Sequence, residues 1–141
     1  MAYTFSVDFD PANPDLTSDS ETQNDIFIAA FNSGDGELFN SLYRDDSISN
    51  FSGEPLTGAA RLAFFKEFLG TKPDLRASIT HAYVAGDVAL IGVNYEIDTT
   101  GPDGEPVQLR GVCTDVLRRG DDGRWLMSID RPVAATGLVA D

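Results

Sequence analysis

The sequence has one cysteine, Cys113, one histidine, His81, and few basic residues. A single cysteine cannot form an internal disulfide, so the apolar core must stabilise the fold. No apolar run approaches the roughly 18 residues that a membrane-spanning helix needs. The N-terminus lacks the basic start and the apolar stretch of a secretory signal peptide. We therefore expect a soluble, cytoplasmic protein.

Basic residues are outnumbered, with 10 Lys and Arg against 23 Asp and Glu and a formal net charge of −13. Proteins bind nucleic acids and anionic membranes largely by placing Lys and Arg against phosphates. The charge therefore argues against both partners. No basic residue precedes Arg44, and we interpret this acidic first part as a solvated face. A docking surface for a basic partner is the alternative.

Several chemical signatures are also missing. There is no cluster with zinc-ligand spacing, no phosphate-binding glycine loop and no Ser-His-Asp signature. The turn at residues 121–123 lacks the ligand spacing and the terminal glutamate of a calcium loop. We therefore expect no metal and no cofactor.

The chain of 141 residues fits one domain, and its 42% apolar content is that of a globular protein. Residues 1–17 are rich in Pro, Asp and Asn and predict an irregular arm before a single domain at 18–141. Apolar residues alternate with polar ones in the arm, which favours a position along a sheet edge or on a partner subunit. The alternating residues are Tyr3, Phe5, Val7 and Phe9.

Three helices are predicted in the first half of the chain. A capping box at Ser18 and Glu21 opens the first helix, which Gly34 ends. Asp35 caps a second, shorter helix, and a third begins near Gly58. The residues predicted to face inward are Ile26, Phe27, Ala30 and Phe31, then Leu38, Phe39, Leu42 and Tyr43, and then Arg61, Phe64, Phe65, Phe68 and Leu69.

After the third helix the pattern changes to the alternation that is typical of strands. We expect strands near 75–85, 87–99, 106–119 and 124–131, joined by Gly- and Asp-rich turns. A short extended run at 47–51 precedes the third helix. Helices followed by a meandering antiparallel sheet predict an α+β fold.

Alternation also assigns the faces of the predicted strands. The outer face carries Val88, Leu90, Val112 and Val116, which a fully solvated sheet face would not need. We therefore expect a homodimer in which a second subunit covers this face. The residues on the inner face are Ala89, Ile91, Val93, Tyr95 and Ile97 in one strand and Leu109, Gly111, Cys113, Asp115 and Leu117 in the next.

Asp115 stands out because the rest of its face is largely apolar. Apolar surroundings favour the neutral form of a carboxyl, and such groups concentrate at functional sites. A neutral Asp115 could donate a hydrogen bond to a ligand carbonyl. Three alternatives stay open: a purely structural Asp115, a register that exposes it to water, or an ionised Asp115 held by Arg61, Arg131 or a tyrosine.

Five segments together resemble the nuclear transport factor 2-like superfamily, in particular its ketosteroid isomerases and SnoaL-like polyketide cyclases. The resemblance covers about residues 22–131 and implies three helices on a strongly curved antiparallel sheet, cone-shaped with an internal pocket. It implies less about the reaction, because this fold hosts isomerases, cyclases, hydrolases and non-catalytic proteins. The segments are residues 27–35, 42–46, 56–58 with Phe64 and Phe65, 115–118 and 122–125.

The isomerases use an aspartate base together with an oxyanion hole of a tyrosine and a protonated aspartate. In the resemblance, Phe27 takes the place of the tyrosine and Asn50-Phe51 the place of the base, whereas the oxyanion-hole aspartate falls on Asp115. The resemblance therefore implies that Asp115 faces the pocket. It argues against steroid isomerase activity by that mechanism.

Three other residues carry groups that could take part in chemistry. His81, expected on the same strand face as Ile79 and Tyr83, could act as a base near neutral pH, although a structural histidine is the simpler interpretation. Asp130 ends the last predicted strand near the open rim of the fold and could assist Asp115, unless it is only a charge in water. Cys113 lacks a basic neighbour on its face, so we interpret it as a small buried residue and not as a nucleophile.

We therefore hypothesise a small-molecule-binding pocket protein of the SnoaL-like type, whose ligand is apolar and carries a carbonyl or similar acceptor. The alternative is an isomerase or cyclase that uses general acid–base chemistry centred on Asp115, with Asp130 or His81 helping. The residues expected to line the pocket are Phe27, Phe31, Tyr43, Phe51, Phe64, Tyr95, Cys113 and Trp125.

Overall fold

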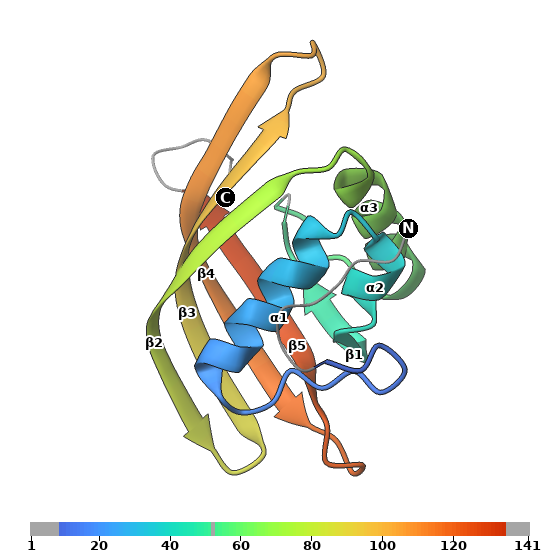
Figure 1. Ribbon diagram of the computed structural model, residues 1–141. Coiled ribbons are helices and arrows are strands. Elements are labelled where there is room, and N and C mark those ends of the chain that lie inside the picture. Colours follow the sequence, from blue (N-terminus) through green and yellow to red (C-terminus); the bar gives the residue numbers. More distant parts are fainter. Residues whose placement is uncertain (1–8, 52, 135–141) are drawn as a thin grey trace.

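The computed structural model describes residues 9–51 and 53–134, and it confirms the α+β architecture, with helices packed on a curved sheet (Figure 1). None of the helices in this described part has the length and hydropathy that a membrane span requires. The helices are α1 (Ser20–Asn32), α2 (Gly36–Asn40) and α3 (Gly58–Gly70). The strands are β1 (Tyr43–Ser49), β2 (Asp74–Ala85), β3 (Val88–Thr100), β4 (Pro106–Arg119) and β5 (Trp125–Ala134).

The five strands form one sheet in the order β1-β5-β4-β3-β2. Strands β2 to β5 pair as consecutive antiparallel neighbours, as their turns predict. The sheet is nevertheless mixed, because β1 lies parallel to β5. This strand also starts at Tyr43, four residues before the extended run that the sequence indicated. It therefore adds a fifth strand beside the last one of the chain.

The helix ends differ in two places from the prediction. Asp19, and not Ser18, is the N-cap of α1, and its carboxylate accepts a hydrogen bond from the Thr22 amide at 3.0 Å. A charged carboxylate at the positive end of a helix competes well with a hydroxyl for this position. Helix α2 has the predicted cap at Asp35 but ends at Asn40, so Tyr43 belongs to β1 and not to the helix.

The assignment of the sheet faces is confirmed. On the inner face, Ile91 and Leu117 are 2% and 0% exposed, whereas Val88 and Val112 on the outer face are 40% and 53% exposed. The helices cover the inner face with aromatic rings that pack mostly edge to face. The fully buried Phe39 of α2 is at the centre of these rings. The core therefore lies between the helices and the inner face of the sheet.

Two asparagine side chains of α1 fix the helix to β2, the edge strand of the sheet. Asn32 hydrogen-bonds both the backbone N–H and the backbone C=O of Leu75. Asn24 donates from Nδ2 to the backbone oxygen of Ala77. An exposed sheet edge has backbone groups without partners, and these amides satisfy some of them.

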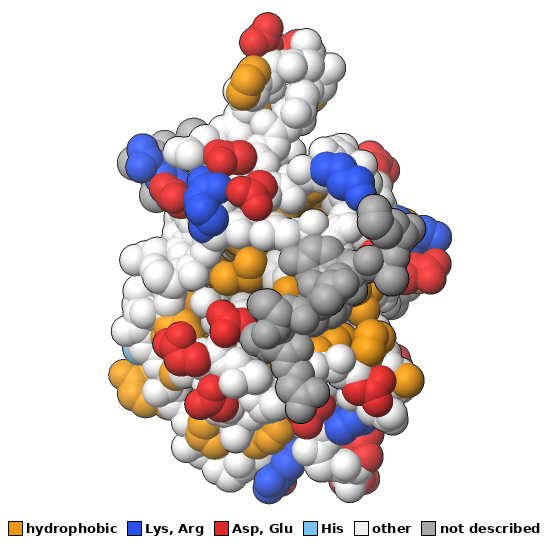
Figure 2. All heavy atoms as spheres, viewed as in Figure 1, with side chains coloured by type: hydrophobic (Ala, Val, Ile, Leu, Met, Phe, Trp, Pro, Cys, Tyr) orange, Lys and Arg blue, Asp and Glu red, His pale blue; other side chains and the backbone are white. Residues whose placement is uncertain are grey.

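Acidic side chains are spread over much of the face that Figure 2 shows, and basic side chains lie beside several of them. Arg76, for example, forms ion pairs with Asp74 and Asp98 at the surface. Exposed pairs of this kind contribute little to stability. Basic residues therefore balance part of the acidic charge at this surface.

Part of the predicted N-terminal arm belongs to the core. Leu16 is fully buried, and its amide donates to the backbone oxygen of Trp125 at 2.8 Å. The carboxylate of Asp15 accepts a hydrogen bond from the Trp125 amide at 2.9 Å. This segment therefore covers the start of β5. Of the alternating residues in the arm, Tyr3, Phe5 and Val7 lie outside the described residues.

We predict that Leu16→Ala lowers the free energy of unfolding by about 2–5 kcal/mol, because it leaves a cavity in the core. Urea unfolding followed by circular dichroism measures this loss. Leu16→Met keeps the apolar volume and should cost less than about 1.5 kcal/mol. Equal stability of Leu16→Ala and the wild type would show that this segment is not part of the core.

Candidate functional site

A cavity of about 310 Å³ lies between the helices and the inner face of the sheet. Its volume is at the lower end of the range of about 300–1,000 Å³ that is typical of small-molecule sites. Its wall is mostly apolar, with aromatic rings from α1 and α3 and aliphatic side chains from β2, β3 and β4. The predicted pocket residues that line it are Phe27, Phe31, Phe51, Phe64, Tyr95 and Cys113.

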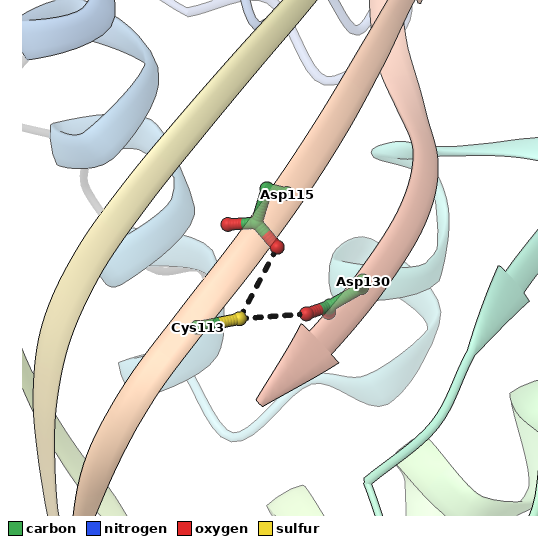
Figure 3. A group of neighbouring side chains, drawn as sticks. All are labelled: Cys113, Asp115 and Asp130. Carbon is green, nitrogen blue, oxygen red and sulfur yellow. Dashed lines mark hydrogen bonds between the residues drawn. The ribbon is translucent and has the colours of Figure 1, made fainter. Parts of the chain in front are cut away.

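Polar groups gather at one place on this wall. Asp115 on β4 and Asp130 on β5 are paired in the sheet register and are 3% and 1% exposed. The Cys113 Sγ lies 3.3 Å from Oδ1 of Asp115 and 3.1 Å from Oδ1 of Asp130 (Figure 3). The Tyr43 hydroxyl of β1 donates a hydrogen bond to Asp130. We call these four residues the carboxyl cluster.

The sheet explains why these side chains meet. Cys113 and Asp115 are two residues apart on β4, so both point to the inner face. Antiparallel pairing with β5 places Asp130 directly beside Asp115. The parallel neighbour β1 then brings Tyr43 to the other side of Asp130. Three adjacent strands are therefore needed to build the cluster.

The two carboxyls have different electrostatic environments. Burial raises the pKa of Asp115 well above its usual range, and the adjacent Asp130 raises it further. Burial also raises the pKa of Asp130, but hydrogen bonds from Asp115, Tyr43 and Cys113 oppose this effect. Two carboxylates this close in apolar surroundings do not both ionise readily. These directions make Asp115 the carboxyl that keeps its proton more readily and Asp130 the one that ionises more readily.

The other two members of the cluster are protonated donors. Burial raises the pKa of Tyr43 and of Cys113 well above the usual range, and the nearby carboxyls raise both further. A thiol in this state is a weak nucleophile, in agreement with the interpretation of Cys113 as a small buried residue.

None of the ion pairs within residues 9–51 and 53–134 involves Asp115 or Asp130. Arg61 instead donates to Asn40 and to the backbone oxygen of Ser47, and its guanidinium lies 5.4 Å from the centre of the Tyr43 ring. The alternative in which Arg61 holds an ionised Asp115 is therefore not what the structure shows. A tyrosine does reach the pair, but it bonds Asp130.

Residues 25–127 match the family described as the SnoaL-like domain. The chain belongs to this family. A search of curated protein sequences finds no significant match. Many solved structures are similar to this SnoaL-like protein, and three of them illustrate the range of names that they carry.

A Xanthomonas campestris protein described as a calcium/calmodulin dependent protein kinase II association domain is 22% identical, with a TM-score of 0.67 over 98% of this chain and 99% of that one. A Streptomyces avermitilis protein described as a dehydratase of the NTF2-like family is 25% identical, with a TM-score of 0.63 over 84% and 100%. A ketosteroid isomerase-like protein from Erwinia carotovora atroseptica is 18% identical, with a TM-score of 0.67 over 78% and 88%. These likenesses support the nuclear transport factor 2-like fold and leave the activity open.

His81 lies on the opposite face of the SnoaL-like sheet from the carboxyl cluster. An irregularity in β2 makes Ile79 pair with Val93 and His81 pair with Gly92, so the alternation shifts between them. The His81 ring packs over Gly92, where a Cβ atom would come within 2.3 Å of it. The prediction that His81 shares the face of Ile79 is therefore wrong, because a β-bulge reverses the alternation.

Three other predicted residues lie elsewhere than expected. Trp125 is buried at the start of β5 and contacts the Arg119 guanidinium, away from the cavity wall. Asp130 does not end its strand, because β5 continues to Ala134. It is therefore buried in the cluster and is not a charge in water at the rim. Tyr43 reaches the site only through its hydroxyl.

The sequence analysis missed several lining residues. Most of them are apolar, and some had been placed on the inner face as core without being assigned to the pocket. Asn24 is polar, and only its spacing of three and seven residues before Phe27 and Phe31 could have placed it on the same helix face. The missed lining residues are Asn24, Phe68, Leu75, Ala77, Val93, Ile97, Leu109 and Pro132.

Cys113, Asp115 and Asp130 are also the group within the described ranges whose ligand atoms could meet at a metal ion, since these atoms lie within 4.8 Å of one another. A metal would have to displace the protons of the thiol and of the carboxyl pair. The raised pKa of Cys113 and of Asp115 opposes this displacement. The arrangement therefore fits a proton-holding cluster better than a metal centre.

We predict that Asp115→Asn becomes more stable relative to the wild type as the pH rises from about 4 to 8. A carboxyl with a raised folded-state pKa contributes most to stability below the unfolded value of about 3.9, and this contribution is lost as the pH rises through the folded value. Asparagine has no such loss. Urea unfolding of both proteins at a series of pH values measures the difference.

The control for this prediction is Asp122→Asn, in the exposed turn before β5. Hydrogen bonds from the backbone and side chain of Arg124 lower the pKa of Asp122, so the stability that its carboxylate contributes is lost only below about pH 4. Asp122→Asn should therefore show no change relative to the wild type between about pH 4 and 8. Carbon-detected NMR gives the Asp115 midpoint directly. A midpoint at or below about 3.9 would show that Asp115 is ionised in the folded protein.

Proposed function

We propose that this protein binds a small, largely apolar molecule in its cavity, and that the carboxyl cluster holds a carbonyl or similar acceptor on that molecule. The observation that supports this best is a proton-holding carboxyl pair in the wall of an otherwise apolar cavity. Buried carboxyls cost stability compared with apolar residues of similar size. Packing alone gives no reason for them, whereas recognition of a polar group does.

The hydrogen-bond pattern allows Asp115 to serve a ligand. Asp130 accepts from Tyr43 at Oδ2 and from Cys113 at Oδ1. It therefore keeps two donors when the Asp115 proton turns toward a ligand carbonyl. A hydrogen bond inside an apolar cavity is stronger than one in water, so one such bond can select a ligand.

We predict that Asp115→Leu weakens the binding of 2-acetonaphthone at least about fivefold relative to 2-ethylnaphthalene, which has the same ring system without the carbonyl. Fluorescence titration gives both dissociation constants. Leu109→Met changes the cavity wall without removing a carboxyl and should leave their ratio unchanged. Failure of both compounds to bind the wild type would contradict the proposal, and an unchanged ratio in Asp115→Leu would contradict the role of Asp115.

A second function, isomerase or cyclase chemistry by general acid–base catalysis, is supported by the different environments of the two carboxyls. Asp130 is the one that three donors help to ionise, whereas Asp115 is kept protonated. Paired groups with separated pKa values often act as base and acid. Asp130 could take a proton from the carbon beside a ligand carbonyl while Asp115 hydrogen-bonds the oxygen. Two similar structures carry enzyme names, dehydratase and ketosteroid isomerase-like.

The same ketone separates binding from catalysis when the titration is repeated in D₂O. Proton transfer at the carbon beside the carbonyl exchanges the methyl hydrogens of 2-acetonaphthone for deuterium, which NMR detects as a loss of the methyl signal. Exchange that needs the protein and disappears in Asp130→Asn would establish the second function. Binding without exchange leaves ligand binding as the function.

We also propose that two copies pair through the outer face of the sheet. This face exposes Val88, Val112 and Ile129, and monomers seldom expose a large apolar patch. The face also carries both signs of charge, since Glu96 pairs in register with Arg76 and with Arg110. A second copy can therefore meet it without the repulsion that the net charge of the chain would otherwise cause.

We predict that light scattering at micromolar concentration reports about twice the 15.2 kDa chain mass. Val112→Glu places a charge on the outer face and should give the monomer mass. The same substitution at Val107, near the start of β4 and on the other strand face, is the control and should leave the dimer intact. A monomeric wild type would contradict the proposed pairing.

A further inference from the structure

Asn24 and Asn32 lie eight residues apart on α1, and both bind β2. Asn32 uses both ends of its amide, since Nδ2 donates to the Leu75 oxygen at 3.1 Å and Oδ1 accepts from the Leu75 amide at 2.7 Å. Asn24 uses one end, donating from Nδ2 to the Ala77 oxygen at 3.2 Å. No residue of 9–51 or 53–134 donates a hydrogen bond to its Oδ1.

The orientation of the Asn24 amide follows from its partner. A backbone oxygen can only accept, so the nitrogen must face Ala77 and the side-chain oxygen must point away from it. Asn24 is 8% exposed and lines the cavity together with Phe27 and Phe31 of the same helix face. The buried side-chain atoms without a partner in the described part of the chain are Gln23 Oε1, Ser47 Oγ and Ser49 Oγ, so the Asn24 oxygen keeps accessible area although the residue is buried. Attachment of the helix to β2 does not require this free oxygen, because Asn32 makes a similar attachment with no group left over.

We propose that Asn24 orients the ligand by accepting a hydrogen bond from a hydroxyl or N–H group on it. This inference rests on the proposed function of the cavity and adds a second polar contact to the one at the carboxyl cluster. Asn24 is held at Ala77 of β2, which pairs through Tyr95 with Gly111 of β4. Asp115 therefore lies about 10 Å away across the sheet and four residues, or about 13 Å, further along it.

The ligand class follows from these two contacts. It carries an acceptor at one end and a donor at the other, and an apolar body of one or two rings lies between them, against the aromatic wall. A hydroxyaryl ketone has this form.

Tyr95 is another polar side chain at the cavity wall, and it is half-buried. Its hydroxyl can donate as well as accept, so it could bind a ligand hydroxyl in place of Asn24. Tyr95→Phe removes this possibility and leaves Asn24 unchanged. It therefore belongs in the test beside the asparagine variants.

The test compares 6-hydroxy-2-acetonaphthone with 2-acetonaphthone, and 6-methoxy-2-acetonaphthone reports the effect of size without a donor. In the wild type, the hydroxyl compound should bind more tightly than 2-acetonaphthone. This preference is the ratio of the two dissociation constants, and it should be at least about fivefold larger in the wild type than in Asn24→Leu. Asn32→Leu removes a similar attachment to β2 outside the cavity and should keep the wild-type ratio, as should Tyr95→Phe. The affinity of the methoxy compound relative to 2-acetonaphthone should be the same in the wild type and in Asn24→Leu, because the methoxy group has no hydrogen to donate.

The outcomes separate this inference from the proposed function. Equal ratios in the wild type and Asn24→Leu, or a ratio that is lost in Tyr95→Phe, would overturn the role of Asn24 while the ketones still bind. No binding of any of the three ketones to the wild type would overturn the proposed function and this inference with it. Asn24→Ala is a second variant in case the leucine does not fold, with circular dichroism as the check of folding.

Discussion

The proton shared by Asp115 and Asp130 is the constraint on which the candidate site depends. Both carboxyls are buried in an apolar wall, and no ion pair to either is present in the described part of the chain. Without a cation, a proton has to limit the charge, and donors have to satisfy the carboxylate that remains. Tyr43 and Cys113 provide these donors. Removing any member would therefore change the protonation of the others, so the cluster acts as one unit.

The position of this cluster depends on the unusual edge of the sheet. Strand β1 runs parallel to β5 and brings the Tyr43 hydroxyl to Asp130. The loop before α3 and the aromatic residues of α1 and α3 then close the cavity over the inner face. At the other edge, asparagine amides hold α1 to β2. The cavity is thus bounded by polar contacts at both sides of the sheet and by aromatic rings between them.

Local patterns predicted most of the fold. Alternation placed Asp115, Cys113 and Ile91 on the inner face correctly, because β3 and β4 pair along their length without an irregularity. His81 was misplaced because the pairing of β2 with β3 has an irregularity between Ile79 and His81, which alternation along one strand does not reveal. The sequence suggested that Asp130 assists Asp115, but it placed Asp130 at the rim, because a buried pair needs the register between β4 and β5, which spacing along one strand does not contain.

The arrangement of polar groups also bears on what an apolar cavity can recognise. Aromatic and aliphatic walls favour burial of a ligand in proportion to its apolar area, without a preferred direction. The orientation of a ligand is set by the few polar atoms of the wall that can still form a hydrogen bond with it. In this cavity such atoms include the Asp115 carboxyl, whose proton can turn to a ligand while Tyr43 and Cys113 still donate to Asp130, and the Asn24 oxygen. Because one lies on the side of β4 and the other on the side of β2, a ligand that satisfies both has one orientation, and a ligand that satisfies neither has no polar contact to orient it.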